Sequence, residues 1–210
     1  MMRNRGFTLI ELLIVVAIIA ILAAIAVPNF LEAQTRAKVS RAKADIRSMA
    51  TAIEAYRIDY NAYPNDVGNG WPWYIPDSVS TPVSYITNAG LHDPFRAHLT
   101  SEYAMRFRYV NYIAGRDAWC DWGVMFPPTC TTPATTGWIG GIRQSITADA
   151  WNDARDLFGD WKMSSAGPDR TASFPFLDGD LVYDPTNGTL STGDILRSQA
   201  EPEATQHEAP

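Results

Sequence analysis

Oxygen-bearing side chains gather near the end of the sequence, in a pattern that could hold a metal ion. They are Asp169, Asp178, Asp180, Asp184, Asn187 and Asp194. Carboxylate and amide oxygens are the ligands that calcium prefers in proteins. The spacing is not that of an EF-hand, and aspartate and asparagine in turns also bind their own backbone amides. The segment therefore predicts either a calcium site or a series of turns.

Motifs that carry out catalysis are missing from the sequence. It has no Gly-x-Ser-x-Gly, no phosphate-binding glycine loop and no His-Glu-x-x-His. The three histidines and two cysteines are not spaced as metal ligands. We therefore predict that the protein is not an enzyme.

Glu11 is the one charged residue in a long apolar stretch near the N-terminus. Between Phe7 and Val27 the only other polar residue is Thr8. A helix of this length rises about 30 Å, which matches the hydrocarbon core of a bilayer. An ionised carboxylate is costly in lipid and usually marks a function. The stretch therefore predicts a membrane-spanning helix with a functional carboxylate.

Two plainer interpretations of this stretch are a cleaved signal peptide and a simple membrane anchor. Arg3 and Arg5 would form the basic start of a signal peptide, and residues 24–26 loosely match a cleavage site. The apolar run is longer than a usual signal core, however. A simple anchor leaves Glu11 unexplained.

The junction before the apolar run resembles the leader junction of type IV prepilins and of type II secretion pseudopilins, the major pseudopilin most closely. The residues that carry it are Arg5-Gly6-Phe7-Thr8-Leu9-Ile10-Glu11. The resemblance implies that a prepilin peptidase and methyltransferase cuts between Gly6 and Phe7 and methylates the new amine of Phe7. It also implies that Glu11 and Pro28 take part in filament assembly.

An apolar stripe at helical spacing follows Pro28. Its residues are Val39, Ala42, Ile46, Met49, Ile53, Tyr56 and Tyr60. Alternating steps of three and four residues place them on one helix face. We predict a single helix from about Phe7 to about Tyr60, roughly 80 Å long, whose stripe packs on the chain's own sheet. A coiled coil is the alternative. The segment Asn61-Ala62-Tyr63-Pro64-Asn65 is expected to stop the helix, with Pro64 as the firm breaker.

The predicted fold is α+β and pilin-like, with a long N-terminal helix packed on a small C-terminal antiparallel sheet with long loops. Strands are expected within Tyr103–Ile113, at the start of Trp161–Asp169 and at Leu181–Tyr183. The predicted segments are a leader (1–6), the transmembrane and filament-core half of the helix (7–28), its amphipathic half (29–62), a globular domain (63–197) and a disordered tail (198–210).

The end of the sequence also resembles the major pseudopilin, whose terminal loop binds calcium. The matching residues are the segment 165–169 and the pair Asp194-Ile195. The resemblance makes Asp169 and Asp194 the first candidate calcium ligands, with Asp184 and Asn187 as further candidates.

Cys120 and Cys130 are the two cysteines. In an exported domain, cysteines so close together are expected to form a disulfide that closes a local loop. Two unrelated reduced thiols are the alternative.

The net charge of −6 argues against general nucleic-acid binding. Loss of residues 1–6 would remove Arg3 and Arg5 and change the charge to −8.

The orientation of the chain in the membrane can be considered from its basic residues. More of them follow the apolar run than precede it, a count that favours a cytoplasmic C-terminal side. The family resemblance instead implies a single-pass inner-membrane protein with a cytoplasmic N-terminus and a periplasmic or extracellular domain.

The resemblance implies a structural function, as a subunit of a homo-oligomeric type II secretion pseudopilus. Implied partners are membrane lipid, the inner-membrane assembly platform and other minor pseudopilins. One alternative is a type IV pilus pilin. Another is a membrane-tethered module in which the 65–160 segment binds a glycan or protein partner, because aromatic side chains stack on sugars as well as filling cores. The seven tryptophans are Trp71, Trp73, Trp119, Trp122, Trp138, Trp151 and Trp161.

Overall fold

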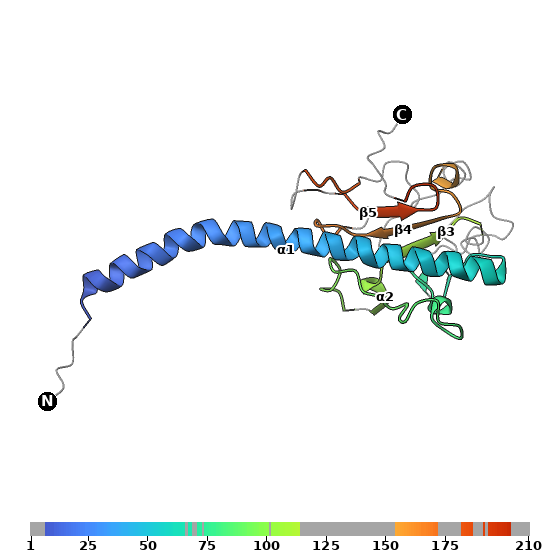
Figure 1. Ribbon diagram of the computed structural model, residues 1–210, viewed down its shortest axis with the longest axis horizontal. Coiled ribbons are helices and arrows are strands. Elements are labelled where there is room, and N and C mark those ends of the chain that lie inside the picture. The colour runs from blue at the N-terminus through green and yellow to red at the C-terminus, as the bar shows by residue number, and fades with distance from the viewer. Residues whose placement is uncertain are drawn as a thin grey trace, which may run out of the picture.

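One long helix and a small sheet make up the architecture of the chain. The computed structural model describes residues 7–65, 67–68, 71–72, 74–100, 102–113, 154–171, 182–186, 191 and 193–202. Helix α1 (Leu9–Tyr60) projects far beyond the domain with its N-terminal half and lies along the sheet with its C-terminal half, as Figure 1 shows. The predicted α+β, pilin-like class is confirmed.

Helix α1 is 52 residues long and close to the predicted helix, and its two ends have identifiable causes. It begins at Leu9 because Thr8 is an extended N-cap residue. It ends at Tyr60 because Asn61 adopts the left-handed conformation, with φ 52°. The helix therefore stops before Pro64 is reached, and Pro64 is not its terminator.

The sheet has three antiparallel strands: β3 (Arg108–Asn111), β4 (Trp161–Ser165) and β5 (Ile195–Ser198). Strand β4 lies in the centre, with Met163 opposite Tyr109 on one side and Arg197 on the other. Smaller elements are the two-residue strands β1 (Val67–Gly68) and β2 (Trp71–Pro72), the 3-10 turn η1 (Asp77–Val79) and the short helix α2 (Glu102–Met105). Residues 154–158 are also helical.

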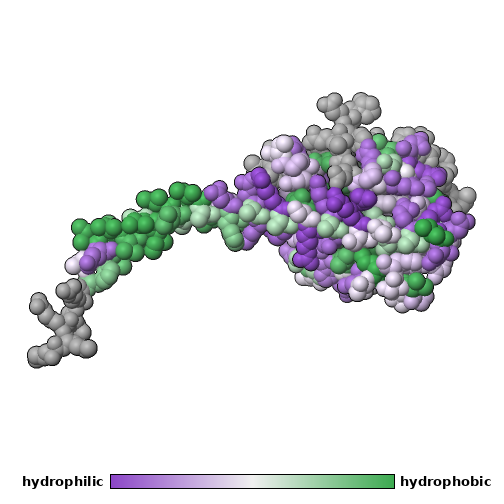
Figure 2. All heavy atoms as spheres, in the orientation of Figure 1, coloured by the Kyte–Doolittle hydropathy of each residue, from purple (hydrophilic) through white to green (hydrophobic). Residues whose placement is uncertain are grey.

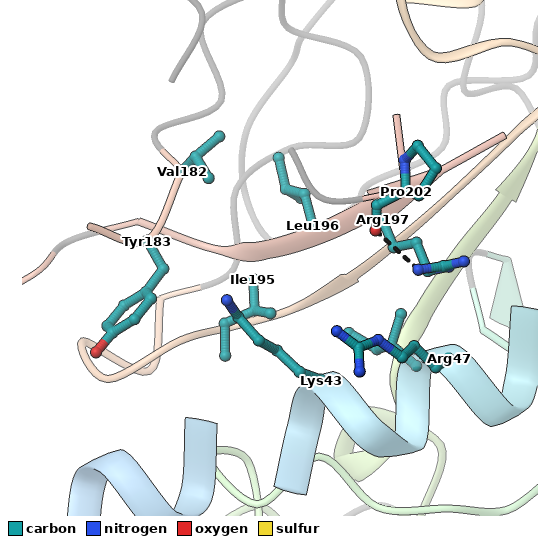
Figure 3. A pocket seen from close by; sticks show the side chains of 9 residues that line it. Lys43, Arg47, Val182, Tyr183, Ile195, Leu196, Arg197 and Pro202 are labelled. Carbon is teal, nitrogen blue, oxygen red and sulfur yellow. Dashed lines mark hydrogen bonds between the residues drawn. The ribbon is translucent and has the colours of Figure 1, made fainter. Parts of the chain in front are cut away.

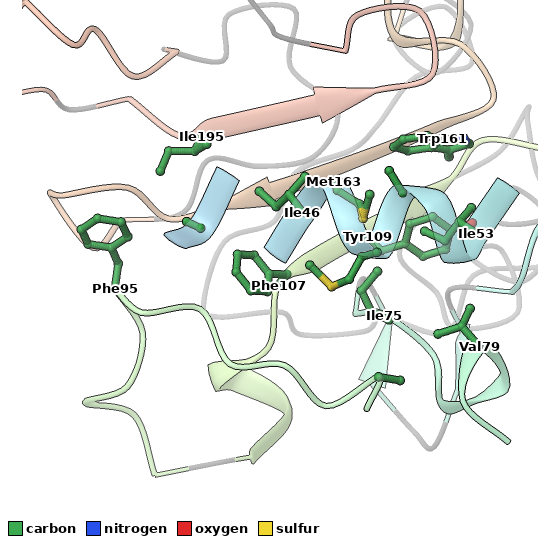
Figure 4. Close-up of a cluster of buried hydrophobic side chains, with 14 of the residues drawn as sticks. Ile46, Ile53, Ile75, Val79, Phe95, Phe107, Tyr109, Trp161, Met163 and Ile195 are labelled. Atoms are coloured by element: carbon green, nitrogen blue, oxygen red, sulfur yellow. The ribbon is translucent and has the colours of Figure 1, made fainter. Parts of the chain in front are cut away.

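The stripe on α1 packs on this sheet, as predicted. Val39, Ala42, Ile46, Met49 and Ile53 are buried against side chains of all three strands and of the loops beside them. Figure 4 shows the resulting core, in which the labelled residues include Phe107, Tyr109, Trp161, Met163 and Ile195. Near the end of the stripe, Tyr56 and Tyr60 stack on each other, with ring centroids 4.4 Å apart, and Tyr60 is exposed.

Two strand predictions were wrong in part. Of the expected strand Tyr103–Ile113, only β3 is extended, because the preceding residues form α2. Arg106 Nη2 donates to Glu102 Oε1 at 3.0 Å, one helical turn away, which favours the helical conformation there. Val182 forms only an isolated parallel bridge with Asp194, and Leu181 lies outside the described residues.

The start of the predicted disordered tail, at residue 198, lies too early in the sequence. Strand β5 includes Ser198, and the next residues are held by hydrogen bonds to the domain. The Ala200 amide donates to the Phe158 carbonyl at 3.1 Å, and Gln199 Nε2 donates to the Tyr63 hydroxyl at 2.9 Å. Polar side chains thus fix a segment that has no large apolar residue. Residues 203–210 lie outside the described part of the chain.

Candidate functional site

The first half of α1 exposes nearly all of its apolar surface. The exposed fraction of its large hydrophobic residues between Phe7 and Leu31 ranges from 44% at Val15 to 79% at Leu9. Figure 2 shows this half as a continuous apolar surface that changes to hydrophilic where the helix meets the domain. By length and composition, α1 is the one described helix that could cross a membrane. An apolar surface of this extent needs lipid or a protein partner to cover it.

Glu11 stands at the start of this surface and forms a reciprocal cap with Thr8. Its Oε2 accepts hydrogen bonds from the Thr8 amide at 2.8 Å and from the Thr8 hydroxyl at 2.7 Å. In return, the Glu11 amide donates to Thr8 Oγ1 at 3.3 Å. The spacing Thr-x-x-Glu before an apolar run is a known capping signal that the sequence prediction missed. In the single chain, therefore, Glu11 already stabilises the helix start.

The predicted cleavage point lies directly before this cap. Phe7 is 73% exposed, and Gly6 lies outside the described residues, so the cut itself is not tested. A cut there would create a positive amine one residue before the N-cap. The N-terminus of a helix also carries a partial positive charge. This charge and the positive amine would both favour a carboxylate nearby.

Pro28 lies inside α1 without breaking it. Its missing N–H removes one helical hydrogen bond, which allows a bend. The helix is gently curved along its free half in Figure 1. Pro28 thus lies between the fully exposed half of the helix and the half that the domain covers.

Two protein-family models match the chain in succession. Residues 1–27 match the prokaryotic N-terminal methylation motif, and residues 29–105 match protein G of the type II secretion system. The N-terminal half of the chain is thus similar to proteins of the pilin and pseudopilin family. The methylation motif covers the predicted cut and Glu11, and the protein G model covers the second half of α1.

Curated relatives bear the names of both branches of this family. The chain is 52% identical over 69 residues to the type IV major pilin protein PilA of Myxococcus xanthus. It is 48% identical over 63 residues to the type II secretion system core protein G of Pseudomonas aeruginosa. It is 52% identical over 66 residues to the type IV wide pilus major component of Thermus thermophilus.

The likeness to these relatives is limited to part of each protein. The aligned segments span 30–31% of this chain and 31%, 44% and 50% of the three relatives. No solved structure matches the chain significantly. The part of the chain that resembles known families is therefore the helix and the start of the domain, up to residue 105.

The candidate calcium ligands are only partly brought together by the globular domain. A side chain on Gly167 would collide with the Gly193 carbonyl, so the two resembling segments do meet. Asp169 Oδ1, however, accepts from the Thr171 amide at 3.1 Å. Asp184 Oδ1 accepts from the Thr186 amide at 2.8 Å. Each of these two carboxylates therefore accepts a hydrogen bond within its own turn.

Asp194, the other first candidate, is buried beside a cation rather than among carboxylates. Within the described ranges, no three side chains of the types His, Cys, Asp and Glu gather as a metal site. The donors that the structure describes thus do not form a calcium site by themselves. The remaining candidates, Asn187, Asp178 and Asp180, lie outside the described residues, so calcium binding stays a prediction.

A buried group of charges, which sequence reasoning missed, lies on the sheet. Lys162 is buried, and burial lowers the pKa of its ammonium group to about 7, with Arg108 adding to this effect and Asp194 opposing it. Its Nζ lies 4.0 Å from the centre of the Phe158 ring. The alternation of residues along β4 did not predict that Lys162 is buried. Lys162 stands between two core residues, and a lysine in that position is normally expected to face solvent.

Asp93 is a second buried charge. Its carboxylate accepts from the Phe95 amide at 2.9 Å, the Ser165 hydroxyl at 2.9 Å and the Ala166 amide at 2.8 Å. Burial raises the pKa of Asp93 in spite of these bonds. This carboxylate connects the turn before β3 to the end of β4, so its role is structural.

Of the tryptophans, Trp161 is a core residue. It is buried, and its Nε1 donates to Glu54 Oε1 at 2.7 Å, which connects β4 to α1. The side chains of the other six tryptophans lie outside the described residues, as do Cys120 and Cys130. The glycan-binding alternative and the disulfide are therefore untested.

A basic groove runs between α1 and β5. It is lined by Lys43 and Arg47 from the helix and by Arg197 from the strand, over an apolar floor that includes Ile46 and Leu196. Figure 3 shows Lys43 and Arg47 rising from α1 toward β5, while Arg197 Nη1 donates to the Pro202 carbonyl at 2.8 Å. This groove lies on the domain-covered half of α1 and is separate from the apolar surface.

Proposed function

We propose that this protein is a structural subunit of a filament that assembles through the exposed half of α1. The observation that carries the proposal is the apolar surface from Phe7 to Leu31, which no part of the described domain covers. Parallel packing of such helices would bury it in a filament core, and lipid would cover it before assembly. The relatives' names, which include pilins and core protein G, support this function.

The proposed route begins with cleavage between Gly6 and Phe7 by a prepilin peptidase, followed by methylation of the new amine. The subunit waits in the inner membrane with a cytoplasmic N-terminus and a periplasmic domain. An assembly platform and minor pseudopilins are the partners that bring it into the filament. The role is structural and includes no catalytic step.

In the filament, Glu11 accepts a charge-assisted hydrogen bond from the amine of Phe7 in a neighbouring subunit. Both hydrogen bonds from Thr8 go to Oε2. An unpaired carboxylate in a water-free core would be costly, so only a stagger that forms this pair is favourable. The pair therefore sets the register between subunits as well as stabilising it.

The type of filament that we propose is a type II secretion pseudopilus. The protein G model matches 77 residues, from 29 to 105, beyond the motif that pilins and pseudopilins share. A type IV pilus pilin is the second candidate, favoured by the 52% identity to the Myxococcus pilin. Deleting the secretion genes or the pilus-assembly genes of the source cell would separate the two candidates, because the filament forms only while the genes of its own system are present.

Substitution of Glu11 tests the assembly mechanism. We expect Glu11→Ala to insert into the membrane normally but to yield no sheared filament, because the Phe7 amine loses its partner. Thr8→Val is the matched control, since it removes the capping hydroxyl and keeps the carboxylate. If both variants lose filament equally, Glu11 acts as a cap alone. A normal filament yield from Glu11→Ala would contradict the proposed function.

A further inference from the structure

Basic side chains gather on α1 directly after its apolar surface ends, where Figure 2 shows a change to hydrophilic residues. Residues 32–47 carry five basic and two acidic side chains, which give a net charge of +3. Residues 48–210 carry ten basic and twenty acidic side chains, which give −10. We call the three basic residues nearest to the apolar surface the basic collar: Arg36, Lys38 and Arg41. Packing of helices through the apolar surface gives this collar no role.

The cations of the basic collar are accessible. The exposed fractions are 67% for the side chain of Arg36 and 70% for that of Arg41, and Lys38 is also exposed. Arg36 Nη2 lies 2.6 Å from Glu32 Oε1, and Arg41 Nε lies 3.6 Å from Asp45 Oδ2. Exposed ion pairs within one helix contribute little to stability, so these arginines can bind another anion at low cost.

The apolar surface fixes where the bilayer lies on α1. The helix begins at Leu9, and the run of exposed large hydrophobic residues ends at Leu31. The helix rises about 33 Å between these two residues, which fills the hydrocarbon core of a bilayer. The polar headgroups add a layer of about 5 to 7 Å on each side. When the chain spans a membrane, the residues that follow Leu31 therefore lie in or next to the headgroup layer.

Arg36 and Lys38 stand at the height of this layer. Their positions along the helix axis are about 8 Å and about 11 Å beyond Leu31. Side chains of a helix lean toward its N-terminus, so both cations reach back toward the headgroups. Val39, the first buried residue of α1, stands about 12 Å beyond Leu31. The domain thus begins to cover the helix just outside the headgroup layer.

The collar is spread around the part of the helix that the domain leaves open. At 100° per residue, Lys38 and Arg41 point about 160° and about 140° away from Arg36, on opposite sides of the axis. Val39, which packs toward the sheet, points into the remaining sector between Lys38 and Arg36. Lipid surrounds a spanning helix, so cations in several directions suit a bilayer better than a partner that covers one face.

We propose that the basic collar binds the anionic headgroups of phospholipids while the chain is anchored in the membrane. Arg36 and Lys38 contact the headgroups, and Arg41 adds attraction from slightly further away. A second copy of the chain at the same height presents the same positive charge and is repelled. The inference rests on the membrane-anchored state in the proposed function and not on filament assembly.

The charge of the rest of the chain sharpens this binding. An anionic bilayer attracts the collar and repels the domain, whose side of the chain carries −10. The two effects together hold the domain off the membrane surface, with α1 upright between them. Lipid binding also gives a reason for the basic residues after the apolar run, whose number by itself favours the opposite orientation of the chain.

The association of a spin-labelled anionic lipid with the full-length chain tests the proposal. The probe is spin-labelled phosphatidylglycerol in phosphatidylcholine vesicles, compared by electron paramagnetic resonance with spin-labelled phosphatidylcholine. In about 0.15 M salt, we expect the wild type to prefer phosphatidylglycerol about fivefold or more. The double variant Arg36→Gln and Lys38→Gln should bring this preference close to one. In about 1 M salt the wild-type preference should also fall, because the charges are screened.

The matched control is the double variant Lys43→Gln and Arg47→Gln. It removes the same charge from the same helix, at about 18 Å and about 24 Å beyond Leu31. These distances exceed the screening length of about 8 Å, so the control should keep most of the wild-type preference. Arg3 and Arg5 are the same in all three chains and do not affect the differences between them. Flotation with the vesicles shows that each chain is inserted.

Three results would overturn the inference without touching the proposed function. They are a wild type that associates equally with both lipids, a preference that survives Arg36→Gln and Lys38→Gln, and an equal loss of preference in the two double variants. The last result would mean that net charge matters and the position of the collar does not. A wild-type chain that does not float with the vesicles would instead overturn the membrane-anchored state on which the inference rests.

Discussion

Lys162 is the residue at which burial and charge conflict most strongly. Its ammonium group is disfavoured in the folded chain, and its pKa falls from 10.5 to about 7 because burial outweighs the attraction of Asp194. Between these two pKa values the unfolded chain holds a proton that the folded chain has released. Stability therefore rises as the pH rises from about 7 toward 10.5, and the contribution is lost as the pH falls through about 7.

We predict that Lys162→Met removes this rise in stability. Chemical unfolding of the full chain in detergent, at several pH values above neutrality, measures it. The absolute stability also changes, because Asp194 loses the attraction of a nearby cation, so the slope against pH is the decisive quantity. Lys43→Met, on the exposed face of α1, should keep the wild-type slope. Equal slopes for all three proteins would show that the Lys162 ammonium does not titrate in this range.

At the scale of single residues, sequence reasoning found the charges that stand out from their neighbours and missed those that depend on distant contacts. Glu11 is visible because its surroundings are apolar, and the Thr8 cap was visible too, although its signal was overlooked. Asp93 and Lys162 are different. Their burial arises from segments separated by up to 73 residues in the chain, as between Asp93 and Ala166. No local pattern encodes such a contact.

At the scale of elements, the helix is the best-predicted part because its signal is local. The steps of three and four residues from Val39 to Ile53 fix a buried face regardless of the partner. The strands are short, and their extent is decided by pairing across the sheet. The residues before β3 therefore became α2, and the segment around Val182 forms one bridge instead of a strand.

The packing of α1 on the sheet can be tested with two isoleucines of the same helix. Ile53 is fully buried in the core, and Ile58, just over one turn further on, is 82% exposed. We predict that Ile53→Ala lowers the free energy of unfolding by about 2 to 5 kcal/mol, because it removes buried methyl groups and leaves a cavity.

Ile58→Ala should change that free energy by less than about 0.5 kcal/mol, as surface substitutions usually do. Thermal or denaturant unfolding of the detergent-solubilised chain gives both values. Similar costs for the two substitutions would mean that α1 does not lie on the sheet in the way that Figure 4 shows.

At the scale of the whole molecule, the chain divides into an exposed apolar half of a helix and a domain with a buried core. The free half of α1 exposes large hydrophobic residues on all sides, and its C-terminal half is held by a core of its own. The family models cover the helix and the start of the domain, so the likeness to known proteins lies in that part. The contribution of the rest of the domain could not be predicted from the sequence, because its residues show no regular hydrophobic periodicity.

The central claim is that this chain is cut, methylated and then assembled through α1. Intact-mass spectrometry of subunits from sheared filaments tests it most directly. We predict a chain that begins at Phe7 and carries one added methyl group, with the mass of residues 1–6 missing. A chain that still begins at Met1, unmethylated and found only in the membrane fraction, would contradict the account.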